Sequence, residues 1–237
     1  MSKQCIGLLP CITLLFTSGC FVDVTGSGEI STRDVDIDDI RAVEVCCGLD
    51  VEIYESTTPS LVLTGDDNII DEVLVNDSGG TLRLRLPTNL TFRPTRSIKA
   101  SIGTAAIDKI DASGGSDIVA RGVPQGSRVE LDGSEGSSFE FTDIETMSLE
   151  IDLSGGSDAE LSGTAADQTV ELSGGSVYRG YELAGDIVTV EASGGSRAEV
   201  SASMALDVDA SGGSTVRHDG EPTIKKSLSG GSAVSPR

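Results

Sequence analysis

The chain has 237 residues, of which 38 are Asp or Glu and 17 are Lys or Arg, for a formal net charge of -21. A surface this acidic repels phosphate backbones, so we expect no nucleic-acid partner. Aromatic residues make up only 3% of the chain and Trp is absent. The core must therefore consist of Val, Ile, Leu and Ala, which favours many thin layers over one bulky centre.

Residues 1–19 have the pattern of an export signal. Lys3 precedes an apolar run over 6–16 that is too short to span a membrane, and small residues follow before Cys20. The ending Leu-Phe-Thr-Ser-Gly-Cys resembles the lipobox of bacterial lipoproteins, although Thr stands where an aliphatic residue is usual. That resemblance implies a lipid on Cys20, attachment to a membrane, and, because Phe21 replaces the Asp of inner-membrane retention, an outer-membrane or cell-surface location. An ordinary signal, cleaved without lipidation, is the alternative.

Residues 20–32 form a short polar segment, interpreted as a lipidated tether. Residues 33–103 are predicted to be rich in strands, because apolar residues alternate there with charged ones, as in Val-Glu-Ile-Tyr-Glu and Leu-Arg-Leu-Arg-Leu. Cys46 and Cys47 lie between two such runs. Neighbouring side chains of a strand point to opposite faces, which predicts one buried and one exposed thiol. A disulfide between these neighbours, in an oxidising compartment, is the alternative.

From residue 104 to 237 the sequence repeats with a period near twenty. The tetrapeptide Ser-Gly-Gly-Ser occurs six times, and Ser-Glu-Gly-Ser once, with first residues separated by 21, 20, 19, 20, 18 and 18 positions. Apolar residues alternate with polar ones on both sides of each tetrapeptide. The units begin at Ser113, Ser134, Ser154, Ser173, Ser193, Ser211 and Ser229.

A repeat of this length without helical periodicity predicts a β-solenoid of about seven rungs, in which each unit buries its apolar face against the next. A chain of antiparallel hairpins is the alternative architecture, but even spacing favours a coil that climbs one strand spacing per unit. The tetrapeptides would then stack at one corner, where Gly readily adopts a positive φ. Glu135 replaces the first Gly of its unit, so we expect that corner to be bulged or differently twisted.

The chain resembles the bacterial auto-transporter adhesin, head GIN domain family, in its lipoprotein form. The resemblance rests on GSGEISTRDVDIDDIRAVEV, GLDVEIYE, PSLVLTGDDNIIDEVLV and GGTLRLRL, followed by the repeats. The family's repeat is commonly Ser-Gly-Ser-Gly-Asp, and here Asp follows the tetrapeptide only at Asp117 and Asp158. The resemblance implies an all-β, right-handed parallel β-helix on an exported protein. It implies adhesion and supplies no catalytic residues.

An acidic residue stands two positions before the first Ser of each unit except the last, where Ser227 takes that place. Stacked rungs would align these residues into a column of carboxylates beside the corner. Ca²⁺ held between rungs is one hypothesis, and a solvated acidic face that discourages aggregation is the other. Six to eight converging oxygens are needed for Ca²⁺, and one carboxylate per rung favours the second hypothesis. The column comprises Asp111, Asp132, Asp152, Glu171, Glu191 and Asp209.

The sequence contains no catalytic motif and points to no cofactor. His218 is the single His, and it is interpreted as a rung residue rather than a base. Tyr178 and Tyr181 offer a small aromatic platform for a glycan. We therefore predict a structural or adhesin-like role without catalysis, with an unknown protein or glycan ligand. A lyase-like carbohydrate-active β-helix enzyme or a Ca²⁺-dependent glycan-binding module is the alternative, and an exposed last rung leaves end-to-end self-association open.

Overall fold

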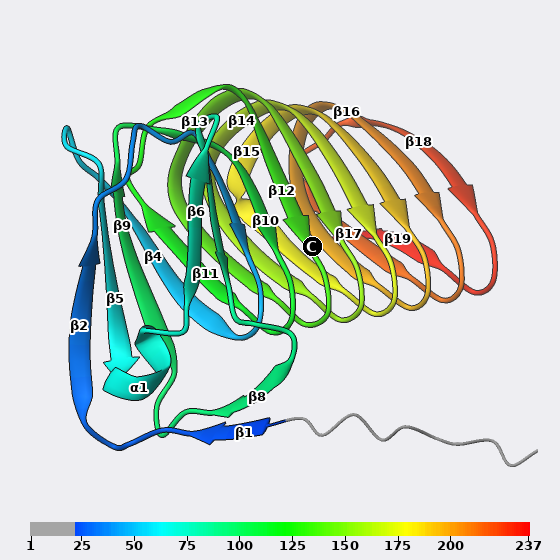
Figure 1. Cartoon of the computed structure of the whole chain (residues 1–237). Coiled ribbons are helices and arrows are strands. Elements are labelled where there is room, and N and C mark those ends of the chain that lie inside the picture. The colour runs from blue at the N-terminus through cyan, green and yellow to red at the C-terminus, as the bar shows by residue number, and fades with distance from the viewer. Residues whose placement is uncertain (1–21) are drawn as a thin grey trace, which may run out of the picture.

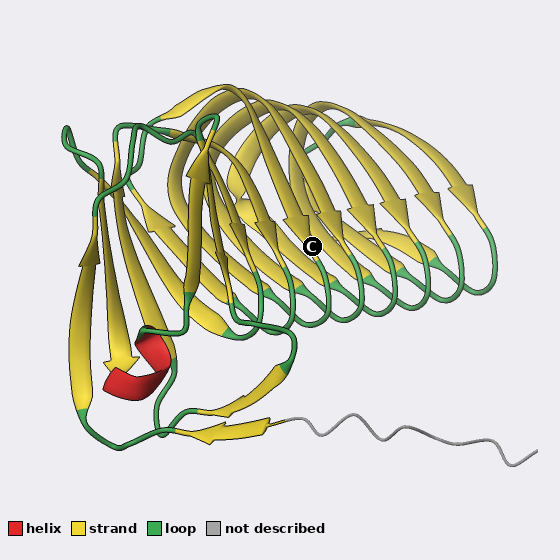
Figure 2. Ribbon diagram, in the orientation of Figure 1, coloured by secondary structure: helices red, strands yellow, loops and turns green. Residues whose placement is uncertain are grey.

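The computed structural model describes residues 22–237, which form a β-solenoid of about six turns with 67% strand and 2% helix. Strands stack side by side along the whole molecule (Figures 1 and 2). The seven tetrapeptides mark successive corners of the solenoid. No helix in this described part is long and apolar enough to cross a membrane. The predicted signal segment and Cys20 lie outside the described residues.

Each turn contributes one strand to each of two layers. The strands of the entering layer lead into the tetrapeptide corner, and those of the leaving layer lead out of it. The entering layer contains β3 (Ala42–Val45), β10 (Ile107–Ala112), β12 (Gln125–Gly133), the second halves of β13 (Ser138–Leu153), β14 (Asp158–Leu172), β15 (Val177–Ala192) and β16 (Arg197–Ala210), and β18 (Thr223–Leu228). The leaving layer contains β4 (Leu49–Glu55), β11 (Asp117–Arg121), the first halves of β13 to β16, β17 (Thr215–Asp219) and β19 (Ala233–Pro236). All these strands pair in parallel, which confirms a climbing coil and excludes a chain of antiparallel hairpins.

The N-terminal strands continue the solenoid and then close its end. β7 (Thr81–Arg85) pairs in parallel with β3, and β9 (Ile98–Thr104) pairs in parallel with β4. The rung of β3 and β4 comes first in the chain, but the rung of β7 and β9 lies outside it at the end of the solenoid. Antiparallel strands lie beyond them: β5 (Ser60–Asp66) on β9, β2 (Ile30–Val35) on β5, and β6 (Leu74–Ser78) on β7. α1 (Asp67–Ile70) buries two isoleucines there, and β1 (Val22–Thr25) pairs with β8 (Leu90–Arg93). The sheet therefore continues across the expected boundary at 104.

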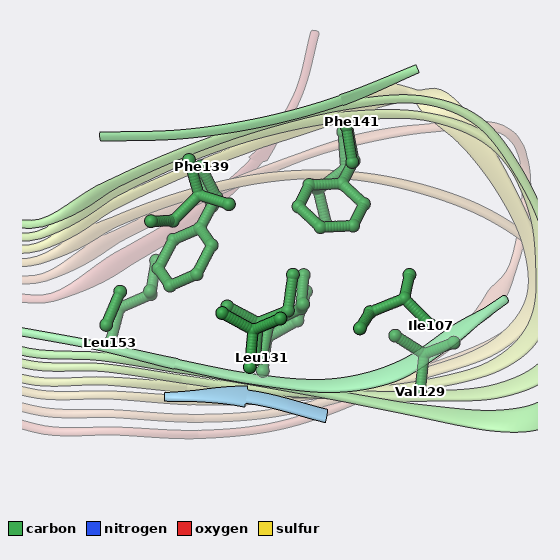
Figure 3. Packing of buried hydrophobic residues seen from close by; sticks show 14 of the residues in the cluster. Ile107, Val129, Leu131, Phe139, Phe141 and Leu153 are labelled. Atoms are coloured by element: carbon green, nitrogen blue, oxygen red, sulfur yellow. The ribbon is translucent and has the colours of Figure 1, made fainter. Parts of the chain in front are cut away.

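The core is a thin apolar layer between the two sheets. Phe139 and Phe141 extend from the leaving layer toward Leu131 and Val129 of the entering layer (Figure 3). Nearly complete burial of such side chains contributes about 1.5 to 3 kcal/mol each, which is how a core with few aromatics remains stable. Because each rung repeats the same inward positions, one rung's apolar residues lie directly over those of the next.

Two polar residues with a possible functional role are buried in this core. Tyr178 has no exposed surface, and its hydroxyl donates to Gln168 Oε1 at 3.3 Å, so it cannot form part of an aromatic platform. His218 is 7% exposed and aligns in register with the buried Val200, which confirms its interpretation as a rung residue.

The tetrapeptides form the stacked corner that the sequence predicts. The first Gly of each Ser-Gly-Gly-Ser has φ from 64° to 67° and the second from 72° to 84°, the pair of positive angles that characterises a type I′ turn. The last Ser is buried in every corner except the final one, where Ser232 is half-buried, and in five of the corners its hydroxyl donates to the carbonyl of the first Ser at 2.7–2.9 Å. These bonds satisfy a polar group that burial would otherwise make costly.

The prediction of a bulged or differently twisted corner at Glu135 is wrong. Glu135 adopts φ 55°, close to the glycines at its place in other corners, and the pairing on either side continues without a shift. The side-chain hydrogen bonds of this corner do differ, because the hydroxyl of Ser137 contacts Ala112 O at 3.1 Å and the hydroxyl of Ser157 at 3.3 Å, in place of the carbonyl of the first Ser. Register shifts occur instead at the opposite bend, as between Phe141 and Ile144, where no repeated turn sequence constrains the backbone.

The far end of the solenoid carries residues that hinder addition of another strand. β18 pairs only with β16, and β19 only with β17, among the described strands. Lys226 occupies the inward position below the buried Val208, and Pro236, which has no N–H, lies on the edge strand β19. An inward-pointing charge and an edge proline are known protections against edge pairing. Both features oppose the end-to-end self-association left open above.

We predict that two neighbouring glycines of one corner differ in their tolerance of alanine. A Cβ on Gly194 would lie 2.9 Å from the backbone N of Gly174, whereas a Cβ on Gly195 would meet nothing within 4 Å. Gly195→Ala should lower the free energy of unfolding by about 1–2 kcal/mol, the cost of a left-handed conformation. Gly194→Ala should cost up to about 1–2 kcal/mol more, because its Cβ must also be accommodated against the backbone of the preceding corner, as the Cβ of Glu135 is at its own corner. Urea denaturation would measure both, and equal losses would contradict the stacking constraint.

Candidate functional site

The carboxylates that the sequence places two residues before each corner form one continuous column. Strand register joins each of them to the next across six rungs, and parallel strands lie about 4.8 Å apart. Their side chains face outward because they alternate with buried residues such as Ile151 and Leu153. Asp111, Asp132, Asp152, Glu171, Glu191 and Asp209 are thus brought together as predicted.

The column has a further member that the sequence analysis missed. Glu44 pairs in register with Asp111 and lies two residues before Cys46. The same offset from the corner would have identified it if Cys46-Cys47-Gly48-Leu49 had been recognised as a corner. Ser227 ends the column at the other side, in register with Asp209.

Cations neutralise the part of the column nearest the N-terminus. Arg83 donates to both carboxylate oxygens of Glu44, at 2.7 and 2.9 Å. Lys109 lies 2.9 Å from Glu130 and 3.0 Å from Asp132, and these two hydrogen bonds raise the pKa of its ammonium group. The same lysine lowers the pKa of Glu130. Repulsion between neighbouring rungs is therefore offset at this end.

The part of the column nearest the C-terminus has no such compensation. Asp152, Glu171, Glu191 and Asp209 form no ion pair with any residue in the part of the chain that the structure describes. Together with the first serines of the adjoining corners they line a hollow of about 300 Å³. We call these four carboxylates and their hollow the acidic groove.

Partial burial and mutual repulsion disfavour the charged forms of carboxylates in this column. Burial raises the pKa of Glu171, and the charges of Glu191 and Asp152 add to the effect. Burial likewise raises the pKa of Asp152, with a further contribution from Asp132. The pKa of Asp111 rises for the same reasons, although Lys109 acts against the shift. A positively charged ligand would relieve this repulsion.

The carboxylates lie in a line and do not converge on a point. Within residues 22–237 no group of three or more His, Cys, Asp or Glu side chains is arranged to hold a metal ion. A line of charges at strand spacing can attract counter-ions or a ligand with several positive groups. Discrete Ca²⁺ coordination needs six to eight converging oxygens, which this arrangement does not provide.

A second hollow, of about 370 Å³, lies on the opposite layer. Its lining includes the partly exposed ring of Tyr181, with the guanidinium of Arg237 4.5 Å from the ring centre, a cation–π contact. Of the two tyrosines expected to form a platform, only Tyr181 therefore reaches the surface.

Comparison with known proteins identifies the family and the fold. The model of the family described as "Putative auto-transporter adhesin, head GIN domain" matches residues 39–222. A crystal structure described as a putative adhesin from Bacteroides fragilis is 20% identical, has a TM-score of 0.82, and aligns over 90% of this chain and 98% of its own.

Two further solved structures share the solenoid. One, from Parabacteroides distasonis, is described as a putative lipid binding protein; it is 19% identical with a TM-score of 0.74, over 91% of this chain and 99% of its own. Another, a putative adhesin from Parabacteroides merdae, is 18% identical with a TM-score of 0.67, over 91% and 99%. No curated protein matches the chain.

We predict that neutralising the centre of the column stabilises the protein at neutral pH. The pKa of Glu171 is raised in the folded state, so between the ordinary value of 4.5 and the raised value the folded protein binds more protons than the unfolded one. Its contribution to the free energy of unfolding therefore falls as the pH rises through that window. Glu171→Gln should raise stability at pH 7 by less than about 1 kcal/mol, since the group is screened by solvent, and the gain should shrink toward pH 4.

Urea denaturation at several pH values would measure this difference. Glu160→Gln, on the opposite layer, is the matched control because it removes the same charge outside the column. A Glu171→Gln variant no more stable at pH 7 than the control would contradict the proposed repulsion.

Proposed function

The chain belongs to the auto-transporter adhesin, head GIN domain family, and from this membership we propose that it is an exported binding protein exposed at the cell surface. Its role is adhesin-like, and it acts without catalysis. Its ligand contacts the acidic groove and carries positive charge, as a protein with exposed Lys and Arg or a glycan with amino groups does.

The observation that carries this proposal is the row of uncompensated carboxylates. Continuous parallel pairing holds the backbone at strand spacing beneath these four carboxylates, Asp152, Glu171, Glu191 and Asp209. The backbone therefore need not become ordered when a ligand binds. Their repulsion is already present in the free protein, and a cationic ligand removes it on binding. Opposite charge also speeds the encounter with such a ligand.

A lipid on Cys20 provides the attachment in this proposal, at the outer membrane or the cell surface. The lipobox-like sequence before Cys20 supports it, and the first strand, β1, begins two residues after Cys20, at Val22, so the lipid would hold the fold close to the membrane. Mass spectrometry of the protein isolated from a bacterial membrane fraction should find an acylated Cys20 as the first residue. A Cys20→Ser variant should be released from that fraction, and an unmodified Cys20 would refute lipid anchoring.

We predict that removing the groove's charges weakens binding to a cationic surface. An immobilised oligolysine peptide serves as the probe in surface plasmon resonance. The groove variant should bind at least about tenfold more weakly, a change of about 1.4 kcal/mol, because several charge contacts are lost together. It carries Asp152→Asn, Glu171→Gln, Glu191→Gln and Asp209→Asn.

A control variant of equal net charge separates a groove effect from a general one. Its four substitutions lie in or beside the leaving layer, where none of these glutamates forms an ion pair with a described residue: Glu52→Gln, Glu160→Gln, Glu182→Gln and Glu199→Gln. Equal weakening in both variants would refute the groove as a specific contact. A glycan array, with a reducing-sugar assay on each glycan bound, then tests the ligand class and the absence of cleavage.

A further inference from the structure

The two adjacent cysteines occupy the first corner of the solenoid. Register aligns Val45 with Ala112 and Asp50 with Asp117, so Cys46, Cys47 and Gly48 take the places of a Ser-Gly-Gly. Cys46 N donates to Leu84 O at 3.2 Å, the rung-to-rung bond that the first Ser makes in later corners. The backbone of this corner is therefore the ordinary one, and the cysteines are an addition to it.

The corner does not need cysteine for its shape. Cys47 has φ 75°, a left-handed conformation that costs a residue with a side chain about 1–2 kcal/mol and costs Gly almost nothing. The corners at 113–116 and 154–157 achieve the same turn with Ser and Gly. Cys47 thus carries a conformational cost that a Gly at this position would avoid.

The cysteines form a disulfide with each other, and this bond is not a structural staple. A disulfide stabilises a fold mainly by closing a loop of the unfolded chain, and the benefit grows with the length of that loop. Cys46 and Cys47 are neighbours, so their bond encloses no loop and links no two elements of the fold. Its value must lie in the chemistry of the sulfur atoms.

The disulfide is open to reagents in solution. Cys47 is exposed, and the half-buried Cys46 lines a hollow of about 200 Å³ with Arg83, Arg85 and Asp111. Arg83 is engaged by Glu44, whereas Arg85 has no carboxylate partner among residues 22–237. Of the two carboxylates that line this hollow, Glu44 is neutralised by Arg83 and Asp111 acts against a thiolate, while the guanidinium of Arg85 favours one on Cys46 and so makes Cys46 the better leaving group.

We propose that the Cys46–Cys47 disulfide is a thiol-exchange site through which the chain forms a covalent bond with an external thiol. The external thiolate attacks Cys47 Sγ, the bond between the two cysteines breaks, and Cys46 leaves as a thiolate. The product is a mixed disulfide on Cys47 and a free Cys46, with no net oxidation. Attack of Cys46 on the mixed disulfide reverses the step, releases the thiolate and restores the original bond.

Reduced glutathione added to the folded full-length protein tests the proposal. After acid quenching and alkylation, peptide mapping by mass spectrometry should find glutathione on Cys47 and the alkyl group on Cys46. The Cys46→Ser/Cys47→Gly variant has the Ser-Gly-Gly sequence of the other corners. It should keep its circular dichroism spectrum and lose every adduct at this corner. Mapping by peptide separates these sites from Cys5, Cys11 and Cys20.

Three results would overturn the proposal. The disulfide could resist glutathione until urea unfolds the protein, the isolated protein could carry two free thiols at 46 and 47, or the adduct could form on Cys46 alone. Arg85→Gln supplies a further measurement, since it should slow exchange without changing the unfolding midpoint. An unchanged exchange rate would remove Arg85 from the mechanism and with it the preference for Cys46 as leaving group.

Discussion

The close approach of backbones at the tetrapeptide corner is the constraint on which the rest of the molecule depends. Each first Gly lies so near the preceding corner that a Cβ would come within 2.8–3.1 Å of a backbone N, as at Gly155 and Gly230. This contact keeps successive corners in step. Because the strands on both sides begin from the same corner, one stack sets the register of the entering and the leaving layer together.

A fixed register turns a repeated residue into a continuous feature of the surface or the core. Inward positions stack into the apolar layer that contains Phe139 and Leu131. Outward positions stack in the same way, so a single acidic residue per rung becomes a column of carboxylates, in which burial and then neighbouring charges raise the pKa values of Asp152 and Glu171. Lys109 and Arg83 offset this at one end, and the acidic groove is the stretch where nothing does.

The phase of the repeat was sufficient to predict the solenoid, its corner and the carboxylate column, because all three follow from local spacing. The inserted rung was harder to predict. β7 and β9 lie outside β3 and β4 although they follow them in the chain, so the alignment of Cys46 with Ser113 depends on a long-range pairing. Glu44 was missed for that reason. Tyr178 was misplaced although its offset after the tetrapeptide is that of the buried Ala159 and Ala198, so the phase of the repeat already indicated that its side chain points inward.

The corners also explain where this fold can change its chemistry. Glu135 and Cys47 both occupy the place of the first Gly, both adopt its positive φ, and neither shifts the pairing of the adjoining strands. The conformational cost is local, since the side chain projects from the end of the layers and leaves the apolar core unchanged. A substitution within a strand would alter the core or the outward column along several rungs. The corner therefore accepts a reactive or charged group at one rung at a time, and the disulfide at Cys46 and Cys47 uses that freedom.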